Sequence, residues 1–264
     1  MLVLRVLSHS LPDDPALDIA LSRALMLRVA AGELPETLRI ARPGAMVAFG
    51  KRDVVGTGYP EAVRAARAGG FEAIERLAGG RASVFHRDTI ALAHAVADAD
   101  PRSRITERFE ATSELVAAAL IRLGLDARVG EVAGEYCPGA HSVNASGAHK
   151  VMGVGQRVVA GGVHVGGVIV VDGAEAVRDI LIGVYSALDL DWRPETTGSV
   201  AAAAPGISWE DVVEALLTEY GARYELEPVE LDRETLALAR RLAPEHLSPP
   251  SSGAMSRRRA IEWR

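Results

Sequence analysis

Two apolar, glycine-rich runs in the middle of the chain constrain the fold most. Residues 150–159 and 163–171 are each long enough for a strand, and the turn-forming Ala160-Gly161-Gly162 joins them. Glycine weakens a strand and commonly marks the close approach of a ligand or another backbone. We therefore expect a hairpin with space beside it for a narrow ligand, although bulges and small-residue packing would explain the glycines as well.

Short strands and helices alternate along the rest of the chain. Turn residues and apolar periodicity predict strands at residues 2–7, 37–41, 46–50, 72–76, 81–85, 89–96 and 127–129. Capping residues and helical spacing predict helices at residues 15–31, 59–68, 101–123, 175–188, 209–220 and 235–242. This alternation agrees with an α/β fold of the α+β type.

Composition is that of an ordinary globular chain. With 264 residues, 48% of them hydrophobic, the chain can bury a large core. We expect one domain at 1–247, made of a core (1–190) and C-terminal helices (191–247), followed by a Pro/Ser-rich tail at 248–264.

No window resembles a membrane span or signal peptide, and one cysteine suits a reducing compartment, so we expect a cytoplasmic protein. The net charge of −6 argues against a nucleic-acid partner.

The single cysteine, Cys137, is a candidate nucleophile. It precedes Pro138-Gly139, a turn signal that predicts a thiol at a loop tip. A cysteine reacts as its thiolate, and a nearby ammonium lowers the thiol pKa. Lys150 could supply that charge if a turn at residues 144–147 pairs the flanking runs. A lone cysteine is more often a small buried hydrophobe, so its position alone leaves both interpretations open.

Three motifs together resemble a known family. Residues 135–139 (Glu-Tyr-Cys-Pro-Gly) and 150–157 (Lys-Val-Met-Gly-Val-Gly-Gln-Arg) look like the core signature of the lipoate ligase, octanoyltransferase and biotin ligase superfamily. Upstream, residues 76–82 (Arg-Leu-Ala-Gly-Gly-Arg-Ala) are similar to the family's Arg-x-(Ser or Thr)-Gly-Gly-x-Ala, except that Ala78 replaces the hydroxyl residue. The similarity runs from about Leu17 to Asp172, and a cysteine upstream of the lysine is most like the cysteine-dependent octanoyl amidotransferase branch.

The resemblance implies a fold and roles for individual residues. The expected domain has a mixed, largely antiparallel sheet flanked by helices. The resemblance places the acyl thioester on Cys137 and an acyl-carbonyl contact on Lys150, which could also lower the thiol pKa. Backbone N–H groups of the glycine loop would face an acyl carbonyl or phosphate. The expected substrate-binding residues are Arg76, Gly79, Gly80, Arg81, Ala82, His86, Gly153, Gln156 and His164.

Two of these positions have alternative interpretations. His86 falls where relatives often carry an acidic residue. His164 falls where octanoyltransferases often place a histidine near the site, so it is either a base that helps to deprotonate the thiol or a half-buried strand residue. No cluster of His, Cys and carboxylate residues has zinc spacing, and we expect no metal site. The chain also lacks a Walker loop and a dinucleotide fingerprint.

The resemblance implies acyl transfer in protein lipoylation. An octanoyl or lipoyl group would pass through Cys137 to the lysine of a lipoyl carrier domain, as in the glycine cleavage H protein or the E2 subunits of 2-oxoacid dehydrogenases. Transfer needs no cofactor beyond the acyl group itself, octanoate or lipoate. One alternative is an ATP-dependent lipoate-protein ligase, which would need ATP and Mg²⁺ and would leave Cys137 unexplained. Another is a non-catalytic acyl- or carrier-binding homologue.

Overall fold

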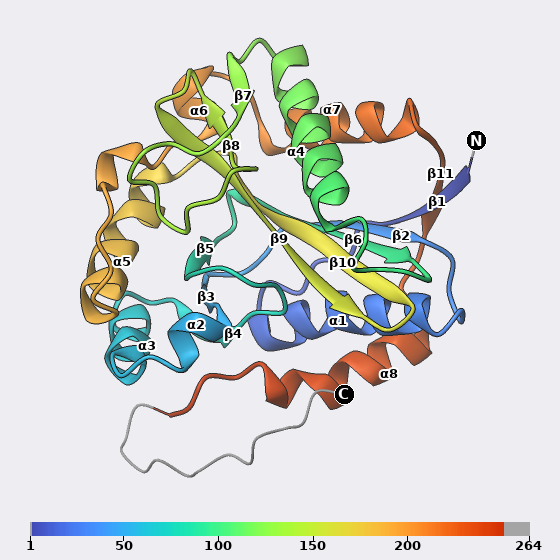
Figure 1. Ribbon diagram of the computed structural model, residues 1–264, viewed down its shortest axis with the longest axis horizontal. Coiled ribbons are helices and arrows are strands. Elements are labelled where there is room, and N and C mark those ends of the chain that lie inside the picture. Colours follow the sequence, from blue (N-terminus) through green and yellow to red (C-terminus); the bar gives the residue numbers. More distant parts are fainter. Residues whose placement is uncertain (1, 251–264) are drawn as a thin grey trace.

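The larger of two sheets forms the centre of the molecule (Figure 1). The computed structural model describes residues 2–250. Eight strands lie in the order β11-β1-β2-β6-β10-β9-β8-β7, of which β11-β1 and β1-β2 pair in parallel and the other neighbours are antiparallel. This confirms the expected mixed, largely antiparallel sheet. The strands are β1 (Leu2–Leu7), β2 (Thr37–Ala41), β6 (Thr89–Ala97), β7 (Ala127–Val129), β8 (Val143–Ala145), β9 (His149–Val159), β10 (Gly162–Val170) and β11 (Tyr224–Val229).

A smaller sheet carries the strands on either side of the glycine loop. It consists of β3 (Met46–Phe49) between a parallel β4 (Glu72–Glu75) and an antiparallel β5 (Ser83–Phe85). The neighbouring strands β2 and β3 thus belong to different sheets. Between them the chain passes so close to Pro12 that a Cβ on Gly44 would lie 1.9 Å from the Pro12 carbonyl oxygen. Glycine is therefore required at this crossing.

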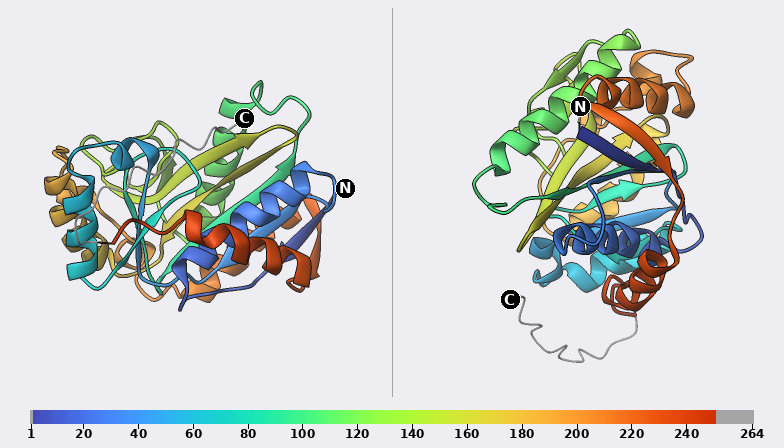
Figure 2. Two further views of the ribbon diagram at one scale, coloured as in Figure 1. Left: turned by 90° about the horizontal axis from the view of Figure 1, so that it is seen from below. Right: turned by 90° about the vertical axis from the view of Figure 1, so that its right-hand side faces the viewer.

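Helices cover both faces of the large sheet (Figure 2). One face carries α1 (Pro15–Ala30) and α8 (Arg233–Leu242), and the other carries α4 (Ile105–Arg122) and α7 (Trp209–Gly221). The pair α3 (Tyr59–Ala68) and α5 (Ala174–Ala187) packs on the small sheet. Asp14 caps α1 through Leu17 N–H, and Pro15 begins the helix, as its sequence predicts. None of the helices within residues 2–250 has the length and apolar character that crossing a bilayer requires.

Several segments differ from the sequence-based expectation. Residues Lys51–Val54, for which no element was predicted, form a short helix, α2, at whose start Gly50 N–H bonds to the Asp53 carboxylate. Residues 194–206, also without a predicted element, contain the short helices η1 (Pro194–Thr196) and α6 (Val200–Ala203). Strand β11 was not predicted: its exposed face is charged and Pro228 lies within it, which suits an edge strand but weakens the sequence signal.

The expected tail begins too early. Ser248 is buried and accepts a hydrogen bond of 2.7 Å from the Tyr59 hydroxyl, while Arg67 donates to its carbonyl. Just before it, α8 continues into η2 (Ala243–Glu245). The chain is therefore held against α3 and β4 as far as Pro249, whose carbonyl accepts from Arg67, and residues 251–264 of the predicted tail lie outside the described residues.

Candidate active site

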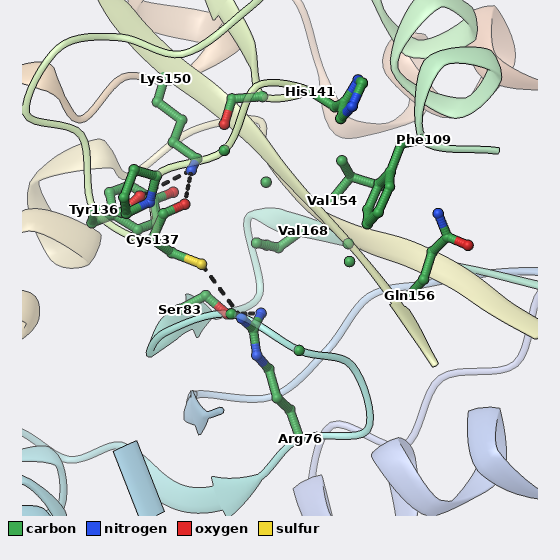
Figure 3. A pocket seen from close by; sticks show the side chains of 18 of the residues that line it. Arg76, Ser83, Phe109, Tyr136, Cys137, His141, Lys150, Val154, Gln156 and Val168 are labelled. Carbon is green, nitrogen blue, oxygen red and sulfur yellow. Dashed lines mark hydrogen bonds between the residues drawn. The ribbon is translucent and has the colours of Figure 1, made fainter. Parts of the chain in front are cut away.

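A cavity of about 320 Å³ lies where the β9–β10 hairpin, the glycine loop and the loop before β8 meet (Figure 3). Seven of the predicted site residues line it: Arg76, Gly79, Gly80, Cys137, Lys150, Gly153 and Gln156. Apolar side chains form much of the remaining wall, namely Phe85, Phe109, Val154 and Val168. The cavity thus has one end with charged groups and a sulfur, and an apolar side suited to a hydrocarbon chain.

Glycines in the hairpin let the neighbouring backbones and the glycine loop come close. A Cβ on Gly155 would lie 2.9 Å from the Ala78 Cβ, and one on Gly167 would lie 1.8 Å from the Gly153 carbonyl oxygen. Small-residue packing therefore accounts for these two glycines. Beside Gly153 there is more room, because the nearest atom to a Cβ there would be 3.4 Å away, on the Lys150 side chain.

Cys137 lies in the loop between β7 and β8, with its backbone in the left-handed region at φ +43°. This conformation costs free energy for any residue except glycine, so it must be held by its surroundings. Its N–H donates to the Tyr185 hydroxyl at 2.8 Å, and that hydroxyl donates to the Ala82 carbonyl at 3.0 Å. The Trp192 ring packs against Tyr185 and Tyr136, with ring centroids 5.3 and 6.1 Å apart. Three aromatic side chains therefore frame the cysteine.

The sulfur of Cys137 accepts two hydrogen bonds from the glycine loop and its flank. Arg81 N–H donates at 3.2 Å, and the Arg76 guanidinium Nη2 donates at 3.4 Å. Gly80, at φ +99°, makes this approach possible, because a Cβ there would lie 2.8 Å from the sulfur. The polar groups of the glycine loop are thus directed at the thiol.

Opposing effects set the acidity of this thiol. Burial raises the pKa of Cys137, but the charges of Arg76 and Lys150, with hydrogen bonds from Arg81 N–H and Arg76, outweigh it and lower the pKa below its ordinary value. The sequence predicted the contribution of Lys150. It did not predict that Arg76 provides the larger one.

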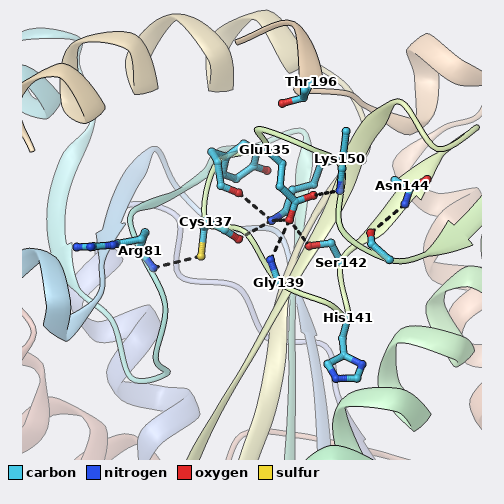
Figure 4. Close-up of polar contacts among 12 residues, drawn as sticks. Arg81, Glu135, Cys137, Gly139, His141, Ser142, Asn144, Lys150 and Thr196 are labelled. Carbon is cyan, nitrogen blue, oxygen red and sulfur yellow. Dashed lines mark hydrogen bonds and ion pairs between the residues drawn. The ribbon is translucent and has the colours of Figure 1, made fainter. Parts of the chain in front are cut away.

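Lys150 is buried and uses its ammonium group within the protein (Figure 4). Its Nζ donates to Glu135 Oε1 at 2.8 Å, to the Tyr136 carbonyl at 2.9 Å and to the Cys137 carbonyl at 2.8 Å. An ammonium group has three N–H donors, and these three oxygens satisfy all of them. For Lys150 to contact an acyl carbonyl, as the resemblance implies, it would have to release one of these oxygens.

Glu135 is a residue of the site that sequence reasoning missed. Its side chain is wholly buried and accepts four hydrogen bonds. Oε1 accepts from Lys150, from the Ser142 hydroxyl at 2.5 Å and from Gly139 N–H at 3.2 Å, and Oε2 accepts from Val132 N–H at 3.0 Å. Its place two positions before Cys137 was the one available signal. Also missed were Tyr185, which has no sequence signal, and the cavity-lining pair Phe109 and His141, whose rings stack at 5.3 Å.

Four predicted site residues do not line the cavity: Arg81, Ala82, His86 and His164. Ala82 is packed in the core of the small sheet, and the Arg81 side chain pairs with Asp53 at 3.2 Å, so only its N–H reaches the sulfur. His86 follows the lining residue Phe85 in the chain and points elsewhere, with its ring against Gly173. Successive residues leaving a strand alternate in direction, which accounts for the difference.

His164 is not among the residues that line the cavity. It lies on β10 three residues before Gly167, the nearest lining residue of that strand, about 10 Å at the usual rise of a strand. Burial, with the charges of His94 and Arg39, lowers the pKa of His164 to about 4. The histidine is therefore neutral at pH 7, and it does not line the cavity that holds the thiol. Of the two alternatives for this residue, the geometry favours the buried strand histidine.

Gln156 lines the cavity, but its amide is already engaged with the start of α4. Oε1 accepts from Arg108 at 3.0 Å, and Nε2 donates to the Ile105 carbonyl at 2.7 Å. Across residues 2–250, no three His, Cys, Asp or Glu side chains come together as metal ligands. The chemical group available in this cavity is the Cys137 thiol, whose pKa is lowered and which lies beside an apolar wall.

Two curated relatives with the same description are similar to this chain in sequence. An octanoyl-[GcvH]:protein N-octanoyltransferase of Geobacillus kaustophilus is 30% identical over 169 residues, 64% of this chain and 59% of the relative. The enzyme of the same description from Bacillus velezensis is 27% identical over 223 residues, 78% of this chain and 76% of the relative. The match thus spans about three fifths of the first relative.

Solved structures show the same fold. A lipoate-protein ligase A bound with ATP superposes with a TM-score of 0.76 at 20% identity, covering 93% of this chain and 95% of that one. The bipartite lipoate protein ligase of Thermoplasma acidophilum gives a TM-score of 0.73 at 19% identity, covering 93% of each chain. The lipoyl protein ligase A/B catalytic domain matches residues 14–221. This chain belongs to the lipoyl protein ligase A/B catalytic domain family.

Proposed function

We propose that the protein is an octanoyltransferase that moves an octanoyl group to the lysine of a lipoyl carrier domain through a thioester on Cys137. The names of the two relatives support octanoyl as the acyl group and GcvH, the glycine cleavage H protein, as a carrier. One observation supports Cys137 as the nucleophile above all others: its sulfur lies in the cavity within hydrogen-bond distance of both Arg76 and Arg81 N–H.

The proposed reaction has two steps. The Cys137 thiolate attacks the octanoyl carbonyl carbon, the new C–S bond forms, and the bond to the donor nitrogen breaks as that nitrogen takes up a proton and leaves as an amine. The amine of an acceptor lysine then attacks the thioester, loses a proton, and releases Cys137 as thiolate. Proton uptake and release balance over the cycle, and neither ATP nor a metal takes part.

The cavity favours transfer over ATP-dependent ligation. A ligase of this fold would direct the glycine loop at the ligand's carboxylate or phosphate, whereas here Arg76 and Arg81 N–H bind the sulfur of the protein's own cysteine. Ala78 also supplies no hydroxyl to that loop. Both features are explained if the acyl group is carried on Cys137.

The test is intact mass after incubation with octanoylated H protein, without ATP, on the wild type and on Cys137→Ala. We expect one octanoyl adduct on the wild type alone, removable by hydroxylamine as a thioester, and octanoyl transfer to an E2 lipoyl domain. Product that requires ATP with free lipoate, and that survives Cys137→Ala, would assign the protein as a ligase. Donor binding with neither adduct nor product would identify a non-catalytic homologue.

A further inference from the structure

One carboxylate gathers donors from three separate segments around the cysteine loop. Glu135 accepts from Val132 N–H, which precedes the loop at 134–142, from Gly139 N–H and the Ser142 hydroxyl within that loop, and from Lys150 on β9. A buried carboxylate is stable only when such partners satisfy it, so the geometry of these segments is fixed together.

The Lys150 ammonium completes the arrangement from the other side. It binds the carbonyls of Tyr136 and Cys137 as well as Glu135, so three consecutive residues of the loop wrap around one Nζ atom. The carbonyls of two adjacent residues can converge on one cation only if the backbone turns sharply between them. Cys137 provides that turn with its left-handed φ of +43°.

We propose that Glu135 is a positioning residue for the nucleophile. Together with Lys150 it holds the loop in the conformation that directs the Cys137 sulfur at Arg76 and at Arg81 N–H. This inference assumes the proposed role of Cys137. It adds that the reactivity of the thiol depends on a carboxylate that does not touch the sulfur, and that Lys150 serves as a tie within the loop when no acyl group is bound.

If Glu135 positions the loop, its loss should change the pKa of Cys137 in the direction opposite to that expected from its charge alone. Glu135 is a negative charge near a thiolate, so neutralising it without moving the loop would lower the pKa of Cys137. If Glu135 instead holds the sulfur next to Arg76 and Arg81 N–H, its loss removes these stabilising contacts and the pKa rises. The sign of the pKa change therefore separates the two roles.

The experiment measures the rate of iodoacetamide alkylation of Cys137 against pH, which needs no acyl donor. In Glu135→Gln, the amide presents an NH₂ group where the carboxylate accepted hydrogen bonds, so at least one donor of the loop is left facing another donor. We expect the alkylation midpoint to rise by about one pH unit or more, which is about a tenfold loss of thiolate below the midpoint. For octanoyl transfer, kcat should fall by a larger factor than KM changes.

Two further variants keep the test decisive. Asp18→Asn disrupts another buried ion pair, with Arg39, and should lower stability without moving the midpoint. Ser142→Ala removes one hydrogen bond from Glu135, keeps its charge, and should raise the midpoint by less; it decides the matter if Glu135→Gln does not fold. A midpoint that falls or stays constant in the folded Glu135 variant, or failing that in Ser142→Ala, would overturn the proposal. Because alkylation needs no acyl donor, this result is independent of whether Cys137 forms an octanoyl adduct.

Discussion

The ion pairs Asp18–Arg39 and Glu135–Lys150 are alike in burial but differ in what surrounds them. In each pair, neither side chain is more than 1% exposed. Arg39, on β2, binds Asp18 and Ser22 of α1 and the carbonyl of His9, so the first pair ties a helix to a strand. The second pair shapes a loop whose backbone is strained.

This difference shows how the same chemistry can serve stability or reactivity. Regular elements keep their own backbone hydrogen bonds, so the pair at α1 and β2 adds to a geometry that already exists. The loop at 134–142 has no ladder of its own, and its shape depends on Glu135 and Lys150. Disturbing either pair should cost stability, but only the second should alter the thiol.

The largest effect on stability is expected from replacing the cationic residue of each pair, Arg39 or Lys150. Lys150→Met and Arg39→Met each leave a buried carboxylate uncompensated and should each lower the free energy of unfolding by about 3–5 kcal/mol. Denaturant unfolding measures the loss, and alkylation of Cys137 measures the thiol. We expect only Lys150→Met to shift the alkylation midpoint, upward, since Lys150 lowers the pKa of Cys137.

A double variant sharpens this test. Glu135→Gln/Lys150→Met removes both charges of the pair, so it should be less destabilised than Lys150→Met alone, yet its alkylation midpoint should stay raised because the tie in the loop is gone. A double variant with wild-type thiol reactivity would contradict the division between the two pairs.

A smaller loss of stability is expected from Ala substitutions at two glycines, of which only Gly80 lies beside the thiol. Gly80 and Gly70 both have left-handed φ, +99° and +82°, so Ala at either position should cost about 1–2 kcal/mol. A Cβ on Gly70 meets no atom within 4 Å, whereas one on Gly80 lies 2.1 Å from Arg76 Nη2 and 2.8 Å from the Cys137 sulfur that this guanidinium binds. We therefore expect Gly80→Ala alone to reduce octanoyl transfer, by about 100-fold. Equal transfer rates in the two variants would show that transfer tolerates displacement of the sulfur and of Arg76.

The smallest effect concerns pH. The pKa of Cys137 is lower in the folded chain than the ordinary value of 9.0. A group with a depressed folded-state pKa contributes stability that is complete above the unfolded pKa and is lost as pH falls through the folded one. The advantage of the wild type over Cys137→Ser in unfolding free energy should therefore grow as pH rises towards 9.0. A difference that is constant or declines over that range would mean that the thiol is not stabilised as thiolate.

Local sequence signals predicted the elements well and their assembly less well. Pro15 after Asp14 marked the start of α1, and Ala160-Gly161-Gly162 marked the turn of the β9–β10 hairpin, because caps and turns depend on neighbouring residues. The separation of β2 from β3 and the pairing of β11 with β1 depend on contacts between distant segments, for which the sequence carries no local signal.

For the site, too, local motifs were predicted and contacts between distant segments were not. The motifs predicted Cys137, Lys150 and the glycine loop as neighbours, since each carries a chemical group in a specific pattern. Glu135 was part of the signature at 135–139 but was given no role there, because its importance comes from four donors that only the fold assembles. His86 and His164 were predicted from their positions relative to the family pattern, and position in a sequence does not fix the direction of a side chain.

The packing of Trp192 against Tyr136 and Tyr185 has a practical consequence. Tyr136 is part of the loop that holds the sulfur, and the Tyr185 hydroxyl bonds to Cys137 N–H, so a rearrangement of that loop changes the surroundings of the indole. Of the other two tryptophans, Trp209 donates its indole N–H to the Thr89 carbonyl on β6, and Trp263 lies outside the described residues. Indole fluorescence from Trp192 thus offers a label-free optical signal for the state of the loop during turnover.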